Sequence, residues 1–545
     1  MKKNIFLILI LAILISTALK VFIINNKEVI TDEQIYNVRA IDWLKTRGLS
    51  TIDQSPLYFY FTDISYHLFG VTTFAGRFMG LLFGGFTIIV VFLLTKRFFE
   101  ERQAIIAALL LGFSSIFLYE LIEMDPIASF FSITAFYFLV IAVHDNNKSF
   151  FYLSAFSYGI SILFKTTTAM TIFGLFAYYV FSVHNKKDVR TITKLLLTFS
   201  VIAFFIMTPI FIYNYLLYSD KGITDLLFDK FLGINHPTYQ GLASAKFSLS
   251  YFPKGLFQIT RNILLFDSIL FVTAIMGFYF FIKKKNIFGI STLIFMIFPY
   301  LLLSGSSISQ HHFVIILPVL AISASYFLNK IKSNKLIVSI FMVFLLLNSY
   351  TAISHALPKG QTNQLKEFST SIPEDAIIIV DSRIYKGVFS WSFFGKNYLD
   401  TNSFSEFLSK QTNLSVTKNI YFVECVPDNC GYASSQLNEF NEKFVEFFSQ
   451  GEYIKTIKEQ DREIFHISKL TLQIPPGVEE FAKSTYEFYY YPSAGYSEKE
   501  RFDSYKTTGI KNILNSFGYL ILYFSLIGAV LIPFLITYIF FKEIE

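Results

Sequence analysis

Long apolar runs recur along most of this chain and constrain its fold more than any other feature. A helix needs roughly 20 apolar residues to cross about 30 Å of hydrocarbon. Hydrophobic residues make up 53% of the sequence and charged residues only 16%, and a soluble protein of 545 residues could not bury so much apolar surface. The sequence therefore predicts a polytopic α-helical membrane protein with about twelve transmembrane helices. Their expected ranges are 4–24, 78–95, 103–119, 127–143, 150–164, 169–183, 193–217, 263–282, 287–303, 313–328, 336–352 and 512–541.

The first apolar run follows two lysines, as the apolar segment of a signal peptide does. It extends for about twenty residues and has no clear cleavage site between small residues. We therefore expect it to be retained as the first transmembrane helix.

Basic residues lie at alternate ends of the expected helices. The short connections on the opposite side, 120–126, 165–168 and 304–312, contain one basic residue, Lys165. Because basic residues mark cytoplasmic loops, the pattern predicts that both termini are cytoplasmic. The basic ends include Lys2, Lys3, Lys96, Arg97, Arg102, Lys186, Lys187, Arg190, Lys283, Lys284, Lys285, Lys330, Lys332 and Lys335.

Three domains are expected. Residues 1–352 form the transmembrane domain, with outer loops at 25–77 and 218–262. Residues 353–511 form a small extracytoplasmic α/β domain, because AIIIVDS (376–382) and NIYFVEC (419–425) have the pattern of buried strands, and segments 452–460 and 462–468 that of a hairpin. Residues 512–545 form the last transmembrane helix.

The two cysteines of the chain, Cys425 and Cys430, lie in CVPDNC on the predicted extracytoplasmic side. Disulfides persist in oxidising compartments, so we expect a bond between them; two free thiols are the alternative. This pair supplies too few ligands for a zinc site.

Carboxylates gather on the predicted extracytoplasmic face, although a charge costs roughly 2.5–3.5 kcal/mol at the centre of a membrane span. One group lies in the first outer loop and the other in YELIEMDP (119–126). Two expected helices separate the groups and can fold side by side, so we expect the carboxylates to surround one cavity. The first group is Asp32, Glu33 and Asp53, and the second is Glu120, Glu123 and Asp125.

Asp125 precedes Pro126, which favours the first turn of a helix. Unpaired N–H groups and the helix dipole stabilise a carboxylate there. Glu120 and Glu123 have an alternative interpretation as polar residues of a solvated turn.

Basic side chains are expected on the same face at Arg77, Lys165, His311 and His312. Arg77 could instead only cap the second expected helix (78–95) near the membrane interface. The two histidines could form an ordinary interfacial turn, because isolated histidines carry little specificity.

Several short motifs follow one another along residues 1–350. Asp32 and Glu33 come after the first apolar run, with Tyr36 three residues on. DQSPLYFY (53–60) combines an acidic residue with Pro-Leu and aromatic residues, and FGVTTFAGRF (69–78) contains Arg77. Asp125 follows the third run, Lys165 follows ILF, and HHFVIILPVLA (311–321) enters a Leu-Pro helix.

In this order the motifs resemble the GT-C glycosyltransferases of the dolichyl-phosphate-mannose protein mannosyltransferase and lipid A aminoarabinose transferase group, the PMT/ArnT-like family. Two departures stand in the second motif: Ser55 and Pro56 replace a double proline, and Gln54 stands where the family often has a basic residue.

The resemblance implies a GT-C fold and a donor sugar linked through phosphate to a polyprenyl chain. The acceptor would be a hydroxyl of a protein, lipid or glycan. Asp32 would be the general base, supported by Glu33, and Asp125 would belong to the catalytic group. Tyr36, Asp53, Arg77, Glu123, Lys165, His311 and His312 would bind substrate. No cofactor is certain; a divalent metal is compatible with Asp53, His311 and His312.

Two other functions fit the helix count. A transporter or flippase also places carboxylates within the membrane, but its two halves often repeat, and no repeat is visible here. The transporter or flippase is the chief alternative; a polysaccharide polymerase or ligase acting on lipid-linked glycans is the second, and the sequence alone separates it poorly. A third is a degenerate transferase that only binds a partner. We expect a multi-pass protein of a prokaryotic plasma membrane with an extracytoplasmic active site, and no nucleic-acid partner.

Overall fold

The structure is a computed structural model that divides into two compact units. We call them the helical unit (Met1–Asn25, Asp42–Ser354 and Asp503–Glu545) and the sheet unit (Asn26–Ile41 and His355–Phe502). Each is described by itself. The described residues are 2–29, 31–41, 43–46, 49–50, 55–120, 123–184, 188–225, 228, 252–304, 310–357, 360–384, 386–410, 415–426, 439–459, 461–486 and 505–544.

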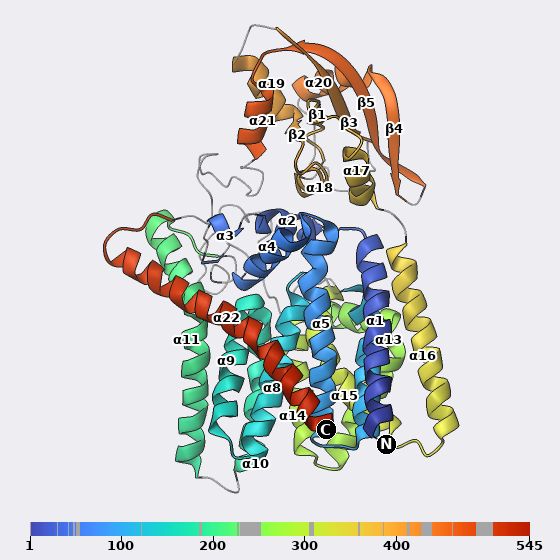
Figure 1. The fold of residues 1–545 in the computed structure, drawn as a ribbon, viewed down its shortest axis with the longest axis vertical. Helices are drawn as coiled ribbons and strands as arrows, with labels where there is room; N and C mark the ends of the chain where they lie inside the picture. The colour runs from blue at the N-terminus through green and yellow to red at the C-terminus, as the bar shows by residue number, and fades with distance from the viewer. Residues whose placement is uncertain are drawn as a thin grey trace. The chain divides into compact units, whose positions relative to one another are not determined.

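Every range expected to span the membrane falls on helix in the helical unit (Figure 1). The long helices are α1 (Lys2–Asn26), α5 (Thr73–Lys96), α8 (Asp125–His144), α9 (Lys148–Phe164), α11 (Val189–Lys221), α13 (Phe252–Lys283), α14 (Ile287–Ser304), α16 (Asn334–Ala356) and α22 (Ile510–Ile544). The shorter elements are α3 (Trp43–Thr46), α4 (Leu57–Phe69), α6 (Glu101–Gly112), α7 (Ser115–Tyr119), η1 (Thr166–Thr171), α10 (Ile172–Val183), η4 (Gln310–Ile315) and α15 (Leu317–Leu328).

Within the described residues, eight helices are long and apolar enough to cross a membrane, judged by length and composition. Two shorter apolar helices, Ile287–Leu302 and Leu317–Leu328, accompany them. The remaining expected spans correspond to α6 with α7, and to α9. Helix α6 has only 12 residues, or about 18 Å of rise, because the helix breaks at Phe113 and Ser114 before α7 begins. The prediction of a polytopic helical membrane protein is confirmed.

Helix α8 lies inside the bundle. Its residues from Asp125 to Ala142 are all buried, and it contacts α5, α9, α10 and η4. A helix that is apolar on every side is expected in such a place. Aromatic rings fill the space around it: the ring centroids of Phe83 and Phe130 are 5.3 Å apart, and those of Phe131 and Phe164 are 5.4 Å apart.

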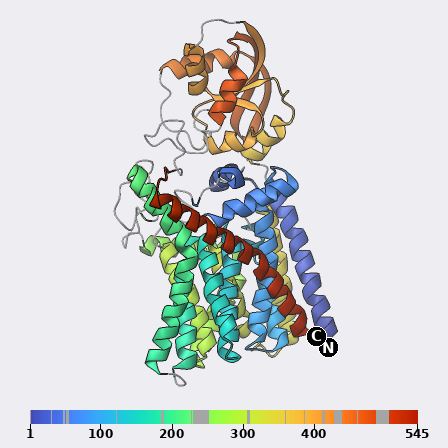
Figure 2. The same ribbon diagram turned by 60° about the vertical axis from the view of Figure 1, so that its left-hand side comes forward.

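The two ends of the chain lie at the same end of the helical unit (Figures 1 and 2). Helix α22 contacts α11, α9 and α5. Near its C-terminus, the Glu543 carboxylate lies 3.0 Å from Arg97 Nη2, and the Glu543 carbonyl accepts a hydrogen bond from Lys96 Nζ at 2.7 Å. Arg97 Nη1 also lies 3.7 Å from Asp145 Oδ1. These contacts fasten α22 to the basic end of α5.

The sheet unit contains a five-stranded sheet in the order β2-β1-β3-β5-β4. Its strands are β1 (Ile377–Val380), β2 (Asn397–Asp400), β3 (Val416–Cys425), β4 (Glu452–Glu459) and β5 (Arg462–Ile474). β1 pairs in parallel with β2 and β3, whereas β3–β5 and β4–β5 are antiparallel. The two predicted buried strands and the hairpin are confirmed. The sequence did not indicate the short β2.

Helices cover both faces of this sheet. Successive residues of a strand point to opposite faces, so Ile378 and Val380 of β1 join one core cluster, and Ile377 and Ile379 join the other. Helices α17 (Gln361–Ser369) and α18 (Lys386–Ser392) supply the first cluster. Helices α19 (Thr401–Lys410), α20 (Glu439–Ser449) and α21 (Val478–Tyr486) supply the second. The predicted small α/β domain is confirmed.

The sheet unit also contains Asn26–Ile41, and with it helix α2 (Thr31–Ala40). The predicted boundary at residue 353 stays a prediction, but the sequence did not indicate that this early segment joins the later domain. Cys425 is disulfide-bonded, as predicted; Cys430, the chain's other cysteine, lies outside the described residues.

Candidate functional site

The helical unit brings three of the predicted site residues together: Asp125, Lys165 and His312. This aspartate is the first residue of α8, and Pro126 occupies the first turn as expected. The Asp125 carboxylate is completely buried. Its Oδ2 lies 3.2 Å from Lys165 Nζ, and its Oδ1 lies 3.3 Å from His312 Nδ1.

Burial makes this arrangement energetically demanding. A buried charge is tolerated only when it is paired or hydrogen-bonded, and Asp125 has the positive end of α8 together with the Lys165 ammonium. The Lys165 side chain is 7% exposed and that of His312 is 21% exposed. The Asp125 carboxylate is therefore fully enclosed, Lys165 is almost completely buried, and His312 is the most exposed of the three side chains.

Lys165 owes its position to a hydrogen-bonded turn at the end of α9. Its backbone is extended (φ −149°, ψ 115°) and ends the helix. The Lys165 carbonyl accepts hydrogen bonds from Thr168 N at 3.1 Å and from Thr168 Oγ1 at 2.7 Å, and the Thr168 hydroxyl is 3.1 Å from Ser161 Oγ. Threonine hydroxyls that bond nearby backbone in this way favour turns over continued helix.

His312 is placed by η4, which lies against α8. Ser129, one turn after Asp125, donates a hydrogen bond from Oγ to the Val314 carbonyl at 3.0 Å. Residues four apart share one face of a helix, so this bond holds η4 on the face of α8 that carries Asp125. The side chain of His311 lies outside the described residues.

Glu120 and Glu123 are both buried, at 3% and 2% exposure. This burial argues against a fully solvated turn. Glu123 has a φ of 57°, in the left-handed region that non-glycine residues seldom occupy. Their roles in the site stay predictions.

Arg77, near the start of α5, is 1% exposed, and its Nη1 donates a hydrogen bond to the Ile24 carbonyl at 2.5 Å. Ile24 lies in the last turn of α1, where carbonyls lack helix partners. Arg77 thus contacts the end of α1, whereas the alternative interpretation expected it to cap the second helix. A role in substrate binding stays a prediction.

Sequence reasoning missed Asp267, which organises the approach to the acidic turn. It interrupts the helical backbone of α13 (φ −137°, ψ 47°). Its Oδ1 accepts hydrogen bonds from Ser115 N at 2.8 Å and Asn348 Nδ2 at 2.7 Å, and its Oδ2 accepts bonds from Ser114 Oγ and Ile116 N, both at 2.8 Å. A charged residue inside an apolar run is itself a functional signal, and this one could have been found in the run at 263–282.

Asp267 thus satisfies the N-terminus of α7, whose free N–H groups need acceptors. Helix α7 leads directly into Glu120 and the acidic turn, and it also contacts η4. The Asp267 carboxylate therefore fixes the segment that precedes Asp125.

The other acidic group is divided between the units: Asp32 and Glu33 belong to the sheet unit, whereas Asp53 falls in the range of the helical unit. Asp32 and Glu33 lie in the first turn of α2, where Glu33 is 1% exposed and Tyr36 is 6% exposed. The side chain of Asp32 and all of Asp53 lie outside the described residues. The expectation that both acidic groups surround one cavity concerns both units and stays a prediction.

Among the described residues, no group of three His, Cys, Asp or Glu side chains is placed to hold a metal ion. Two of the three residues proposed as metal ligands, Asp53 and His311, are not described at side-chain level.

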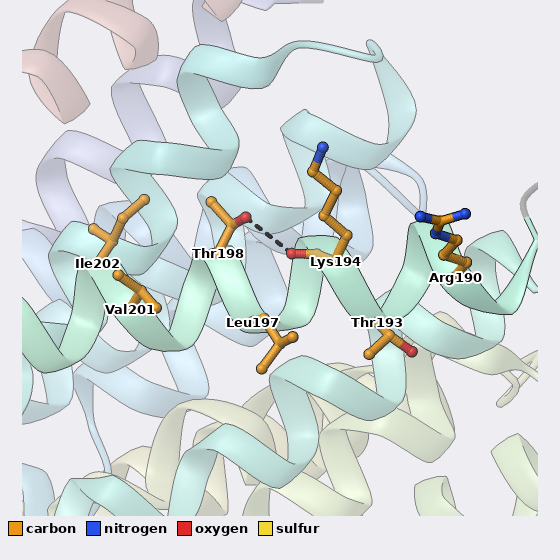
Figure 3. Close-up of a pocket in the computed structure, with 7 residues that line it drawn as sticks. All are labelled: Arg190, Thr193, Lys194, Leu197, Thr198, Val201 and Ile202. Carbon is orange, nitrogen blue, oxygen red and sulfur yellow. Dashed lines mark hydrogen bonds between the residues drawn. The ribbon is translucent and has the colours of Figure 1, made fainter.

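Two pockets of the helical unit lie apart from the Asp125 cluster. One, of about 630 Å³, follows a face of α11 from Arg190 to Ile202 (Figure 3). The other, of about 610 Å³, lies between α6, α15 and α16 and has mostly apolar walls. Neither contains Asp125, Lys165 or His312.

Residues 53–213 match the family model of dolichyl-phosphate-mannose-protein mannosyltransferases. This range contains Asp125 and Lys165. No curated protein matches the chain.

Solved structures share the fold at low identity. ArnT from Cupriavidus metallidurans superposes with a TM-score of 0.53 when bound to undecaprenyl phosphate and 0.54 in the apo state, at 10% and 11% identity, over 84% of this chain and 97% of that protein in both cases. The Archaeoglobus fulgidus oligosaccharyltransferase tethered to an acceptor peptide has a TM-score of 0.50 at 15% identity, over 87% of this chain and 74% of its own.

The fold matches cover most of the chain, and the family match covers the helices that carry Asp125 and Lys165. The chain is a membrane protein that shares the fold of ArnT and, over residues 53–213, resembles the dolichyl-phosphate-mannose-protein mannosyltransferases.

Proposed function

We propose that the protein transfers a sugar from a polyprenyl-phosphate donor to a hydroxyl of a protein, lipid or glycan acceptor. The reaction takes place on the extracytoplasmic face of a prokaryotic plasma membrane, with both termini in the cytoplasm. The buried Asp125 carboxylate, held between Lys165 and His312, is the observation that supports this function best. ArnT binds undecaprenyl phosphate, a ligand of the proposed donor class.

The Lys165 ammonium suits the leaving group. A lysine ammonium has three N–H donors, so Lys165 can bind Asp125 and still offer donors to a phosphate. His312 lies beside the same carboxylate, with Nδ1 3.3 Å from Asp125 Oδ1. Positioned cations stabilise the charge that develops on a departing phosphate. Asp125 thereby orients the two groups that receive the polyprenyl phosphate.

Asp32 acts as the general base. The acceptor hydroxyl oxygen attacks the anomeric carbon, and its proton passes to the Asp32 carboxylate. The bond between the anomeric carbon and the phosphate oxygen breaks, and the electron pair leaves with polyprenyl phosphate. Glu33, the neighbour of Asp32 on α2, steers or supports this base, while Tyr36, Asp53, Arg77, Glu123 and His311 contribute to substrate binding.

A deletion strain tests the transferase. Mass spectrometry of its envelope should show the loss of one sugar from a protein, lipid or glycan, and the intact gene should restore that sugar. Accumulation of a lipid-linked glycan on the cytoplasmic side of the membrane would indicate a flippase instead, and an unchanged envelope would contradict both functions.

A binding measurement tests the donor site directly. Undecaprenyl phosphate added to the purified protein should bind, and free inorganic phosphate should compete only weakly because it lacks the lipid chain. Equal binding of both would contradict a site built for a lipid phosphate.

A further inference from the structure

Helix α17 of the sheet unit begins at a residue that cannot cap it. The N-cap is Gly360, which has no side chain to accept a hydrogen bond. The N–H groups of the first turn therefore need another acceptor. Glu28 supplies it: its Oε1 accepts the bond of Thr362 N at 2.6 Å, and its Oε2 accepts that of Asn363 N at 3.3 Å. A carboxylate in this position also meets the positive end of the helix dipole.

The glycine is required by this contact and not by its backbone angle. Gly360 has a φ of −74°, which any residue can adopt. A Cβ added there would lie 2.2 Å from Glu28 Cδ and 2.4 Å from Glu28 Oε2. Because such distances cannot exist, a side chain at residue 360 would displace the Glu28 carboxylate from α17.

Two further hydrogen bonds tie the same helix to the segment around α2. Gln34 Nε2 donates to Thr362 Oγ1 at 2.8 Å and to the Val29 carbonyl at 2.8 Å. Asn363 Nδ2 donates to the Lys27 carbonyl at 3.2 Å. Glu28 precedes the Asp32 and Glu33 pair by four residues and Gln34 follows it directly, so the contacts lie on both sides of the pair.

Helix α2 is also covered along its length. Its sequence TDEQIYNVRA is polar, yet Glu33, Gln34, Asn37 and Arg39 are each less than 5% exposed. It packs on α18 of the same unit. A short polar helix has little stability of its own, so its shape and place depend on what it is packed against.

We propose that the sheet unit positions the acidic pair. Glu28, Gln34 and Gly360 act as positioning residues: they fasten the segment carrying Asp32 and Glu33 to α17, so the pair moves with the sheet unit as one body. This inference rests on the proposed function only in giving the pair a catalytic role; the fastening itself stands on the contacts above.

Two single variants and their combination test the contact in the full-length protein. In Gly360→Ala and in Glu28→Ala, hydrogen exchange of the peptides covering 27–41 should quicken by about five- to ten-fold, the factor that follows from losing a helix cap. Exchange in the helical unit should stay unchanged. Because both substitutions break one contact, the double variant should exchange no faster than Glu28→Ala alone. Additive effects would overturn the fastening.

Thr362→Val is the second probe, because it removes the Gln34 bond while keeping the shape of the side chain. It should quicken exchange of 27–41 by a smaller factor and leave the thermal midpoint of the whole protein nearly unchanged. If none of these variants changes exchange in 27–41, the segment is held by other contacts and the proposal is wrong.

The effect of positioning on sugar transfer is measured in the deletion strain. Displacing a reacting group by about 1 Å lowers the rate on the order of 100-fold, so Gly360→Ala should reduce the sugar restored to the deletion strain by about ten-fold or more. Undecaprenyl phosphate should bind as it does to the unaltered protein. Loss of this binding together with a lower thermal midpoint would indicate general destabilisation and contradict positioning. If no sugar is lost in the deletion strain, the proposed function fails, while the exchange result still decides the fastening.

Discussion

The two groups of candidate catalytic residues are held in different ways. In the helical unit, Asp125 is held by an ion pair with Lys165 and a contact with His312 in a buried cluster. In the sheet unit, the helix with Asp32 and Glu33 is held by a helix cap, amide hydrogen bonds and close packing at Gly360. The first arrangement depends on charge and the second on shape. Neutral substitutions of similar size should therefore matter most in the helical unit, and added volume should matter most in the sheet unit.

Asp32 is an exception to this comparison. It lies in the sheet unit, but a neutral substitution should have a large effect there because a general base must be charged. Asp32→Asn should lower transfer by about 100- to 10,000-fold, the usual contribution of general base catalysis. Its folding and its affinity for undecaprenyl phosphate should stay the same. Restoration of sugar in the deletion strain is the measurement.

Glu33→Gln is the matched control, since it neutralises the adjacent carboxylate on the same helix. It should reduce transfer less than Asp32→Asn does. If Asp32→Asn restores the sugar fully while Glu33→Gln does not, the base is Glu33 and the assignment to Asp32 is wrong.

The next largest effect is expected for Asp267→Ala, which should lower the stability of the helical unit. Asp267→Ala leaves Ser115 N and Ile116 N without their acceptor, and an unsatisfied buried donor costs about 1–3 kcal/mol. We expect the free energy of unfolding to fall by about 2–4 kcal/mol, seen as a lower thermal midpoint in detergent. Asp267→Asn keeps one oxygen acceptor and should lose less. Equal midpoints for Asp267→Ala and the unaltered protein would show that α7 does not depend on this carboxylate.

Lys165→Gln tests whether the positive charge of Lys165 contributes to donor binding. Glutamine keeps a hydrogen-bond donor near Asp125 but removes the positive charge, and a hydrogen bond to a charged group contributes about 1.5–3 kcal/mol. Undecaprenyl phosphate affinity should fall by about ten- to 100-fold. Lys148→Gln, an exposed substitution at the other end of α9, should change nothing. A similar loss in both variants would point to a general charge effect.

Much of the fold could be predicted from the sequence because the local composition of a segment identifies membrane spans and buried strands. The run of apolar residues predicts each long helix, and AIIIV predicts β1 without knowledge of its neighbours. The Asp125 cluster could be predicted for a similar reason. Asp125, Lys165 and His312 lie at the ends of apolar runs on one predicted side of the membrane. Residues at the ends of membrane spans on the same side of the membrane lie at a similar depth, so these three residues could be expected to lie close together.

The contacts that sequence reasoning missed join residues far apart in the chain. Glu28 meets Thr362 and Asn363 across more than 300 residues, and nothing in a polar loop indicates which helix it will cap. Asp267 meets Ser114 across 153 residues. Its place in an apolar run was visible, but its partners depend on a break in α13 that local composition does not predict.

Lys366 gives the smallest effect and completes the comparison, because it is a half-buried lysine without a carboxylate partner within the described residues. Its Nζ donates to the Trp391 carbonyl at 3.2 Å and lies 5.5 Å from the centre of the Trp391 ring. Burial, and then the charge of Lys396, lowers the pKa of Lys366 from 10.5 to about 8. Lys165, by contrast, lies beside Asp125.

The sign of the pH effect follows from proton binding. Between pH 8 and about 10.5 the unfolded chain keeps the Lys366 proton and the folded sheet unit loses it, so stability should rise with pH in this window. The gain should be about 1–3 kcal/mol, followed by Trp391 fluorescence during thermal unfolding. Lys366→Met should be more stable than the unaltered protein at pH 8, and this advantage should shrink toward pH 10.5. A constant difference between the two proteins at every pH would show that Lys366 stays charged in the folded state, and that the sheet unit, like the helical unit, accommodates a lysine charge in its interior.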